Sequence, residues 1–269
     1  KAAFLGRADY DSMLGLDPDE LLGALSRTVY RPDVERALSS SAGARRLHDA
    51  VRTHLARALE EMRRFYTGSA RELVDLLLAQ WDLHNLLTLV RGHAARAAPD
   101  DVLAYVVPVG GLDDASAREV ARQRELAVAV QLLAAWRLPT PALARSLVTA
   151  WPEYERTGNL AALETQLADA HAEHVAAALD RLGDDARPLR DAHARQVDAR
   201  NLLAALRLRQ ALAASETDRL DPELERRAML GGGRLSRESL AAVARAAAPE
   251  DAPVILARVP AGAPWVEAV

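Results

Sequence analysis

The sequence predicts an all-α protein, and three observations carry this prediction. Aromatic residues make up only 4% of the 269 residues, while alanine, leucine, arginine and glutamate are abundant, which favours helices over sheets. Helix-start signals recur along the chain. Between these signals, apolar residues recur at spacings of three and four, the pattern of helices that pack on other helices.

Capping residues mark the expected helix starts in chain order. Asp17-Pro18-Asp19-Glu20 places a capping carboxylate, a first-turn proline and a third-position glutamate in sequence. Further starts are expected at Ser69 with Glu72, Ser116 with Glu119, Thr140 before Pro141, Asp221 before Pro222 and Glu223, and Ser236 or Arg237.

Apolar stripes follow these starts and define the expected helical faces. They comprise Leu21, Leu22 and Leu25; Leu47, Val51, Leu55 and Leu59; Leu73, Leu76 and Leu77; Leu160, Leu163 and Leu167; and Val175, Leu179 and Leu182. Only Val102 to Val109 could pass for a strand, and Pro108 with Gly110 and Gly111 ends it. We expect a further loop at Gly231 to Gly233.

Composition excludes several classes of function. The net charge of −4 and the pI near 6.0 provide no basic field, so no nucleic-acid partner is indicated. The absence of cysteine excludes disulfides, thiolate metal sites and a cysteine nucleophile. No run reaches the roughly eighteen apolar residues of a membrane helix, so we expect no transmembrane segment and a cytoplasmic location.

One sequence pattern occurs twice. Residues 81–92 read WDLHNLLTLVRG and residues 197–208 read VDARNLLAALRL, and both contain Asp-x-x-Asn-Leu-Leu-x-x-x-Arg. The two copies lie 116 residues apart (198 − 82), and a glycine break and a helix start follow each copy. Such self-similarity predicts repeated helical lobes. We expect a first lobe at 1–115, a second at 116–235, and the start of a truncated third lobe at 236–269.

The polar residues of the motif do not predict a reactive site. On a helix, Asp82 and Asn85 lie beside an apolar stripe, where short polar side chains commonly bond the backbone of a neighbouring element. Arg91 lies about half a turn away from Asp82, so the three side chains do not converge. We therefore expect a structural role, with no catalytic, metal or cofactor function, for Asp82, Asn85, Arg91, Asp198, Asn201 and Arg207.

The chain resembles a known family over these residues. The stretch YTGSARELVDLLLAQWDLHNLLTLVRG, its echo VDARNLLAALRL and the following LGGGRLS resemble the C subunit of bacterial and archaeal A/V-type ATPases, related to the eukaryotic V-ATPase d subunit. The early LLGALSRTVYRPDVERAL matches the same family. The resemblance extends from about Tyr10 to about Leu240, whereas the family's N-terminal Tyr-x-x-Ala-Arg-x-Arg segment and the C-terminal half of its third lobe have no counterpart.

The resemblance implies a fold and a role. It implies a funnel of three similar helical lobes on the cytoplasmic end of the membrane proteolipid ring, with a socket for the end of the central shaft. The chain would couple the rotating shaft to the ion-translocating ring and perform no chemistry itself. Its partners would be the proteolipid ring and the shaft subunits.

A helical metal-binding enzyme and a generic helical scaffold are the alternatives. His171 and His174, with Glu173, could belong to such an enzyme, but neither histidine has the glutamate three residues earlier that a di-iron bundle needs. Gly231 to Gly233 lack the Gly-Lys-Ser/Thr ending of a phosphate-binding loop. A scaffold unrelated to ATPases is favoured only if the two motifs do not lie in similar lobes.

Overall fold

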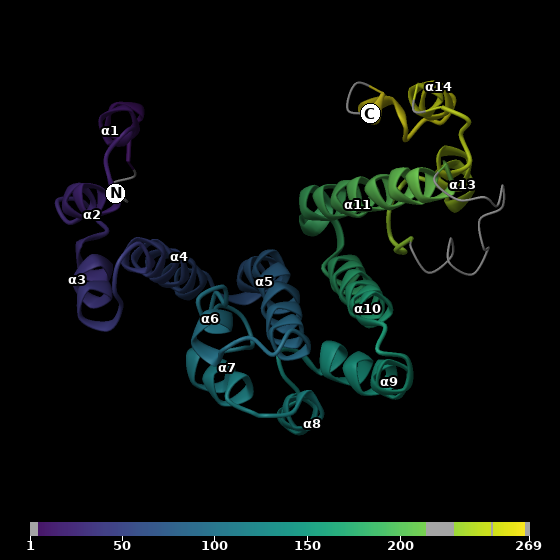
Figure 1. Ribbon diagram of the computed structural model, residues 1–269. Coiled ribbons are helices and arrows are strands. Elements are labelled where there is room, and N and C mark those ends of the chain that lie inside the picture. The colour runs from purple at the N-terminus through teal and green to yellow at the C-terminus, as the bar shows by residue number, and fades with distance from the viewer. Residues whose placement is uncertain (1–4, 214–228, 249, 267–269) are drawn as a thin grey trace. The chain divides into compact units, whose positions relative to one another are not determined.

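The computed structural model describes residues 5–213, 229–248 and 250–266, and every element in those ranges is a helix (Figure 1). The prediction of an all-α protein is confirmed. The chain divides into two compact units, residues 1–132 and 133–269. The predicted repeat of about 116 residues and its three lobes stay predictions.

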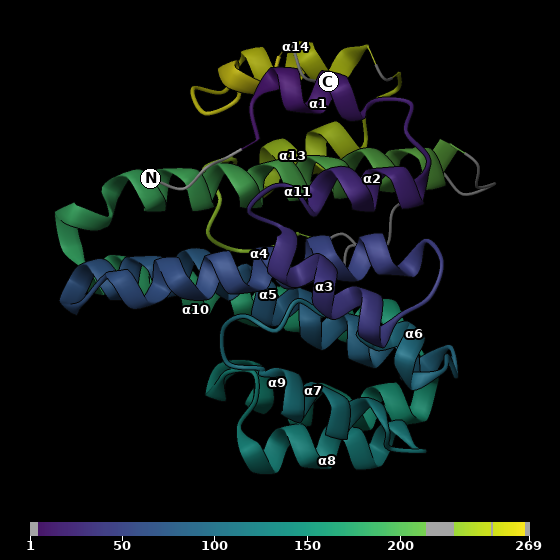
Figure 2. The ribbon, with the colours of Figure 1, turned by 90° about the vertical axis from the view of Figure 1, so that its left-hand side faces the viewer.

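The first unit contains two long helices, α4 and α5, which pack on each other and on shorter helices. Its elements are α1 (Arg7–Met13), α2 (Pro18–Leu25), α3 (Arg31–Ser40), α4 (Arg45–Phe65), α5 (Gly68–Ala94), α6 (Pro99–Leu103), α7 (Asp114–Ala121) and the start of α8 (Leu126–Trp136). Figure 2 shows α3 lying against α4, and their buried side chains join those of α2 in one apolar cluster: Leu22, Leu25, Val34, Ala37 and Ala50.

A buried ion pair fastens α3 to α4 beside this cluster. The Asp33 carboxylate accepts a hydrogen bond from Arg57 Nη2 at 2.8 Å and lies 3.0 Å from His54 Nδ1. Burial by itself raises the pKa of Asp33, but the contacts with Arg57 and His54 outweigh it and hold that pKa below its ordinary value. Tyr30 stacks on the His54 ring, with the ring centroids 3.9 Å apart.

Helix α5 is the core helix of the first unit. It packs against α4, α6 and α7, and its Val74 and Leu78 form a second apolar cluster with Ala56 of α4 and with Val107 and Val109 of the loop after α6. Within the described residues it is the one helix long and apolar enough to cross a membrane, with a mean hydropathy of 1.2 over 18 residues. However, 56% of that window is buried inside the protein, as in the core helix of a globular domain.

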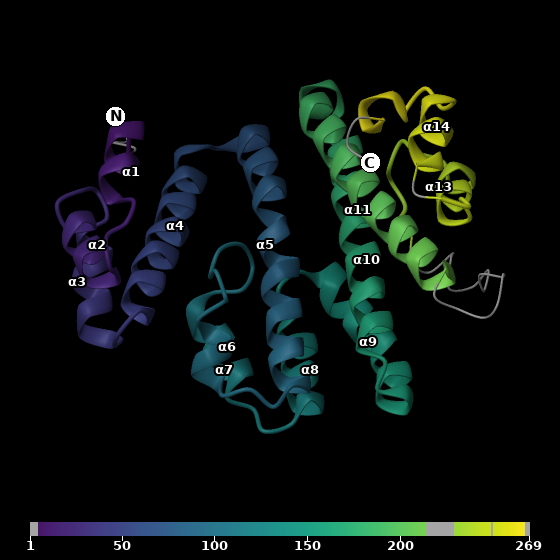
Figure 3. The same cartoon turned by 45° about the horizontal axis from the view of Figure 1, so that its top comes forward.

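The second unit is a succession of helices that each pack on the next. Figure 3 shows α10 and α11 side by side. In the described residues this unit contains the end of α8 and then α9 (Pro141–Thr157), α10 (Leu160–Arg181), η1 (Gly183–Ala186), α11 (Arg187–Ala213), α13 (Arg237–Ala244), α14 (Asp251–Ala257) and η2 (Ala263–Trp265). The side of α11 that carries Leu202, Ala205 and Leu208 packs on α13, and this cluster continues into Leu256 of α14.

Three of the expected helix starts are confirmed by their hydrogen bonds. Asp17 accepts from the backbone N–H groups of Asp19 and Glu20 at 2.9 Å each, while Glu20 accepts from the N–H of Asp17. Thr140 Oγ1 accepts from Leu143 N at the start of α9, and Ser236 Oγ from Ser239 N at the start of α13. These are the bonds that satisfy otherwise unpaired N–H groups in a first turn.

Two expected caps are wrong, and one cannot be compared. Helix α5 begins at Gly68, so Ser69 lies within its first turn instead of at its cap. At α7 the cap is Asp113, whose Oδ1 accepts from Ser116 N at 2.7 Å. Asp113 has a side-chain acceptor as good as that of Ser116 and lies three residues nearer the start. The expected start at Asp221 lies outside the described residues.

The segment Val102 to Val109 does not form a strand. Its first two residues complete α6, and Val106 to Val109 form a loop that contains a tight turn, with Val109 N donating to the Val107 carbonyl at 2.7 Å. Side chains hold this segment in place: Arg52 Nη1 donates to the Val106 carbonyl at 2.7 Å. Further hydrogen bonds to the backbone of this segment come from His84 and Asn85 of α5, which lie in the first copy of the motif.

Candidate functional site

The first copy of the motif holds the loop 106–109 through Asn85. This side chain is 0% exposed, and its Nδ2 donates to the Val107 carbonyl at 2.6 Å. Its Oδ1 accepts from Val107 N at 2.9 Å. One amide therefore satisfies both backbone groups of a buried residue, as a neighbouring strand would.

Asp82 holds the next part of the same loop. Its side chain is buried, with the residue 4% exposed, and Oδ1 accepts from Gly111 N at 2.8 Å. Gly110 has a φ of +92°, and a Cβ placed there would lie only 2.5 Å from Asp82 Oδ1. Glycine is therefore required at position 110 both for its backbone conformation and for the close approach of the carboxylate.

Burial shifts the protonation of Asp82. Removal from water raises the pKa of this carboxyl to about 6, while hydrogen bonds from the N–H groups of Gly111 and Leu112 oppose the shift. The carboxylate is mostly ionised at neutral pH, where it accepts the loop N–H groups. Its charge is satisfied by the backbone N–H groups of Gly111 and Leu112.

Asp82→Asn is expected to change how stability depends on pH. The folded-state pKa of about 6 lies above the ordinary 3.8, so the folded protein holds the Asp82 proton more tightly than the unfolded chain does. The stability that this proton contributes is complete below pH 3.8 and is lost as the pH rises through 6. The shift corresponds to about 3 kcal/mol. In urea unfolding, the free energy of unfolding of the wild type minus that of the variant should be larger at about pH 4.5 than at pH 7.5. An equal difference at both pH values would contradict the assignment, and the exposed Asp11→Asn serves as the control.

The second copy of the motif makes the same kinds of bond in the second unit. Asn201, 2% exposed, donates from Nδ2 to the Leu230 carbonyl at 2.9 Å and accepts from Leu230 N at 2.7 Å. Asp198, 1% exposed, accepts from Leu235 N at 2.9 Å. A Cβ on Gly233 would overlap Asp198 Oδ1, which matches the relation between Gly110 and Asp82. Burial also raises the pKa of Asp198.

The two arginines of the motif do not join these clusters. Arg91 and Arg207 are exposed, and each lies nine residues beyond its aspartate, which is about 13.5 Å along the helix axis. The structure therefore brings Asp82 together with Asn85 and Asp198 together with Asn201, each around one loop. In both copies the aspartate and the asparagine accept from or donate to backbone groups of that loop.

The sequence of this chain matches a known protein family. The family described as ATP synthase (C/AC39) subunit matches residues 1–268. The chain belongs to this family. The resemblance to the C subunit of A/V-type ATPases is thereby confirmed.

Several relatives support the assignment to the C/AC39 family. The C subunit of the V-type ATP synthase of Thermus thermophilus is 34% identical over 216 residues, which cover 77% of this chain and 59% of the relative. The V-type C subunit of Deinococcus radiodurans is 28% identical over 60% of this chain and 45% of its own length. The A-type C subunit of Haloferax volcanii is 25% identical over 88% and 64%. The C/AC39 chain thus spans less than two thirds of the length of these relatives.

The sequence does not predict that Gly110 and Gly233 lie against the carboxylates of Asp82 and Asp198. They belong to the predicted glycine breaks, but Gly110 follows its aspartate by 28 residues and Gly233 by 35 (110 − 82 and 233 − 198). Asp169 was also missed, and its Oδ1 accepts from Gly231 N at 3.2 Å. The exact repeat ends at the motif arginine, so no constant offset connects each motif to its loop.

The histidines proposed for a metal site lie in the second unit without a complete ligand set. Burial lowers the pKa of His171 to about 4, with smaller contributions from His193 and His174. Across the described ranges, no group of three His, Cys, Asp or Glu side chains could hold a metal ion. At the glycine break, carboxylates of Asp169 and Asp198 already accept from the N–H groups of Gly231 and Leu235, where a phosphate would need donors.

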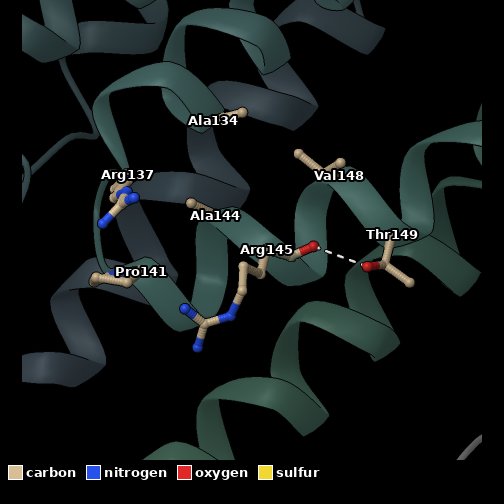
Figure 4. A pocket seen from close by; sticks show the side chains of 7 residues that line it. All are labelled: Ala134, Arg137, Pro141, Ala144, Arg145, Val148 and Thr149. Carbon is tan, nitrogen blue, oxygen red and sulfur yellow. Dashed lines mark hydrogen bonds between the residues drawn. The ribbon is translucent and has the colours of Figure 1, made fainter.

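Two hollows lie on the C/AC39 chain away from the motifs. One, of about 700 Å³, lies between α3–α4 and α6–α7, and carboxylates neutralise its main arginines: Arg45 with Asp101, Arg52 with Asp49, and Arg118 with Asp114. The other, of about 410 Å³, lies in the second unit between the end of α8 and α9 (Figure 4), and its lining is Ala134, Arg137, Pro141, Ala144, Arg145, Val148 and Thr149.

Arg137→Gly is expected to stabilise the chain by about 1 kcal/mol. Arg137 ends α8 in the left-handed region, with φ at 57°, where an L-residue other than glycine is strained by about 1–2 kcal/mol. The N–H groups of Arg137 and Leu138 bond back to Ala134 and Leu133, the Schellman pattern that glycine favours. Urea unfolding measures the change, and Arg96→Gly, with φ at 53°, should behave likewise. Destabilisation in both variants would refute the interpretation.

Proposed function

We propose that this chain is a non-catalytic central-stalk component of a rotary A/V-type ATPase or ATP synthase. In this role it couples the rotating shaft to the proteolipid ring on the cytoplasmic side of the membrane, during proton or sodium transport. Membership of the ATP synthase (C/AC39) subunit family over residues 1–268 is the observation that carries the proposal. The Thermus and Haloferax relatives are themselves C subunits of V-type and A-type ATP synthases.

The chemistry of the buried polar groups supports a mechanical role. The five buried polar or charged side chains of the described residues are Asp33, Asp82, Asn85, Asp198 and Asn201. Each of them bonds a backbone group or another side chain of the same unit. A coupling subunit must transmit torque without deforming. Packed helices, with loops that buried side chains hold by hydrogen bonds, have the low compressibility that this requires. The proposed funnel of three lobes would present one end to the ring and a socket to the shaft.

Co-isolation from membranes tests the proposal. The full protein that contains this chain is tagged, and the assembly is extracted from its own membranes in a mild detergent. We expect the proteolipid ring and the shaft subunits to be recovered with it in fixed stoichiometry. A tagged protein that is recovered without both of them would refute the central-stalk role. An untagged strain, processed identically, supplies the control for carry-over of the ring.

A further inference from the structure

The hollow between the end of α8 and α9 has an apolar floor and a cationic rim. Its floor is formed by Ala134 of α8 with Pro141, Ala144 and Val148 of α9. Val148 is 50% exposed, which is unusual for a branched aliphatic side chain in a concave place. Figure 4 shows the Arg137 and Arg145 side chains near Pro141, and these two cationic lining residues are called the rim here. The volume of about 410 Å³ lies within the range of binding pockets.

The charge at the rim comes from Arg137 and Arg145. In the part of the chain that the structure describes, no carboxylate lies within 4 Å of the Arg137 or Arg145 guanidinium. The larger hollow of the first unit differs, because Arg118 and Arg45 there contact Asp114 and Asp101. Among the described residues the rim thus carries two positive charges without a carboxylate partner, beside exposed apolar surface, and charge complementarity calls for an anionic occupant.

Two further features are found at the end of α8, in Arg137 and in the residue before it. Arg137 has a left-handed backbone conformation in which glycine would be less strained. An arginine at this position therefore lowers the stability of the helix end. Trp136, the preceding residue, is 42% exposed. Tryptophan and arginine are among the side chains most enriched in residues that dominate protein–protein binding.

We propose that this hollow is a docking site for an amphipathic helical segment of another subunit of the same complex. The segment inserts a large apolar side chain between Ala144 and Val148, and an Asp or Glu one turn away pairs with Arg137 and Arg145. Residues 141, 144, 145, 148 and 149 follow the spacing of one face of α9, along which a second helix can lie. The inference rests on the proposed function, which supplies the other subunits.

The shape of the site favours a protein over a bilayer as the occupant. A membrane surface is met by protruding apolar side chains and by clusters of about four to eight basic residues. Here the floor is concave and the rim carries two arginines. A concave apolar floor can receive one apolar side chain of a helical segment, and the two arginines can pair with a carboxylate of the same segment.

Photo-crosslinking in the assembled complex tests the site. Val148 is replaced by p-benzoyl-phenylalanine in the full protein, the complex is isolated, irradiated and digested, and the adduct is sequenced by mass spectrometry. We expect an adduct to a peptide of another subunit, with an Asp or Glu within about four residues, one helical turn, of the attached position. An adduct to lipid, an adduct to a peptide without such a carboxylate, or no adduct in an intact complex would each overturn the inference. Failure of the complex to assemble around the wild-type protein would instead refute the proposed function.

Charge reversal at the rim adds a second readout. Arg137→Glu with Arg145→Glu should lower the adduct yield by about tenfold, because both ion pairs become repulsive. Arg156→Glu, on the same helix and also without a carboxylate partner in the described residues, should leave the yield unchanged. Arg137→Gly should lower the yield although it stabilises the chain, so loss of folding cannot explain the effect. A yield that both rim variants leave unchanged would refute the pairing.

Discussion

Asn85→Ala is expected to lower the free energy of unfolding by about 4 kcal/mol. The substitution removes both bonds to Val107 and leaves a buried N–H and a buried C=O without partners, each worth about 1–3 kcal/mol. Asn201→Ala should produce a similar loss in the second unit, because Leu230 is held in the same way. Urea unfolding followed by circular dichroism measures both changes.

Two controls separate hydrogen bonding from volume in this experiment. Asn85→Asp keeps the size of the side chain and can still accept from Val107 N, but it cannot donate to the Val107 carbonyl while ionised. We expect it to remain destabilising by about 2–3 kcal/mol. Gln80→Ala, on the exposed side of the same helix, should change stability by less than about 0.5 kcal/mol. Losses below about 1 kcal/mol in both alanine variants at Asn85 and Asn201 would contradict the role given to these residues.

Gly110→Ala is expected to lower the free energy of unfolding by about 3 kcal/mol or more. The strain of an L-residue at φ +92° contributes about 1–2 kcal/mol, and the new Cβ displaces the Asp82 carboxylate from its buried N–H donors. Gly233→Ala isolates the second effect, since its added Cβ meets Asp198 while its φ lies outside the left-handed region. Thermal or urea unfolding supplies the measurement.

A double-mutant cycle checks the cause of the Gly110 effect. If the clash with the carboxylate is responsible, Gly110→Ala should cost less in an Asp82→Ala background, with a coupling of at least about 1 kcal/mol. Gly43→Ala is the matched backbone control, because Gly43 has φ +57° and nothing within 4 Å of an added Cβ. Additive effects at Gly110 and Asp82 would show that backbone strain alone explains the loss.

Local chemistry explains how far the fold could be predicted. Asp17, Thr140 and Ser236 cap helices because the required acceptors and N–H groups lie within three residues of one another. Ser69 and Ser116 satisfied the same pattern but were displaced by helix starts that lie upstream. Competing caps a few residues apart cannot be ranked without the packing that sets where each helix enters its unit.

Longer-range contacts set the limit of prediction at the motif. The loop 106–109 is held by hydrogen bonds from Arg52 and Asn85, which lie far from it in sequence. The sequence predicts that Asp82 and Asn85 lie beside the apolar stripe of a helix, but it does not indicate which backbone groups they bond. The loops also differ in length, with Val107 lying 22 residues after Asn85 and Leu230 lying 29 residues after Asn201. Sequence spacing alone could not align them.

ATP-driven ion transport tests the central claim that this chain transmits rotation and performs no chemistry. Vesicles carrying the complex are prepared with and without the full protein, and ATP hydrolysis and ion uptake are measured on the same samples. We expect the head to hydrolyse ATP in both preparations, with ion uptake lost in its absence and restored when the protein is added back. Ion uptake that proceeds equally well without the protein would contradict the claim.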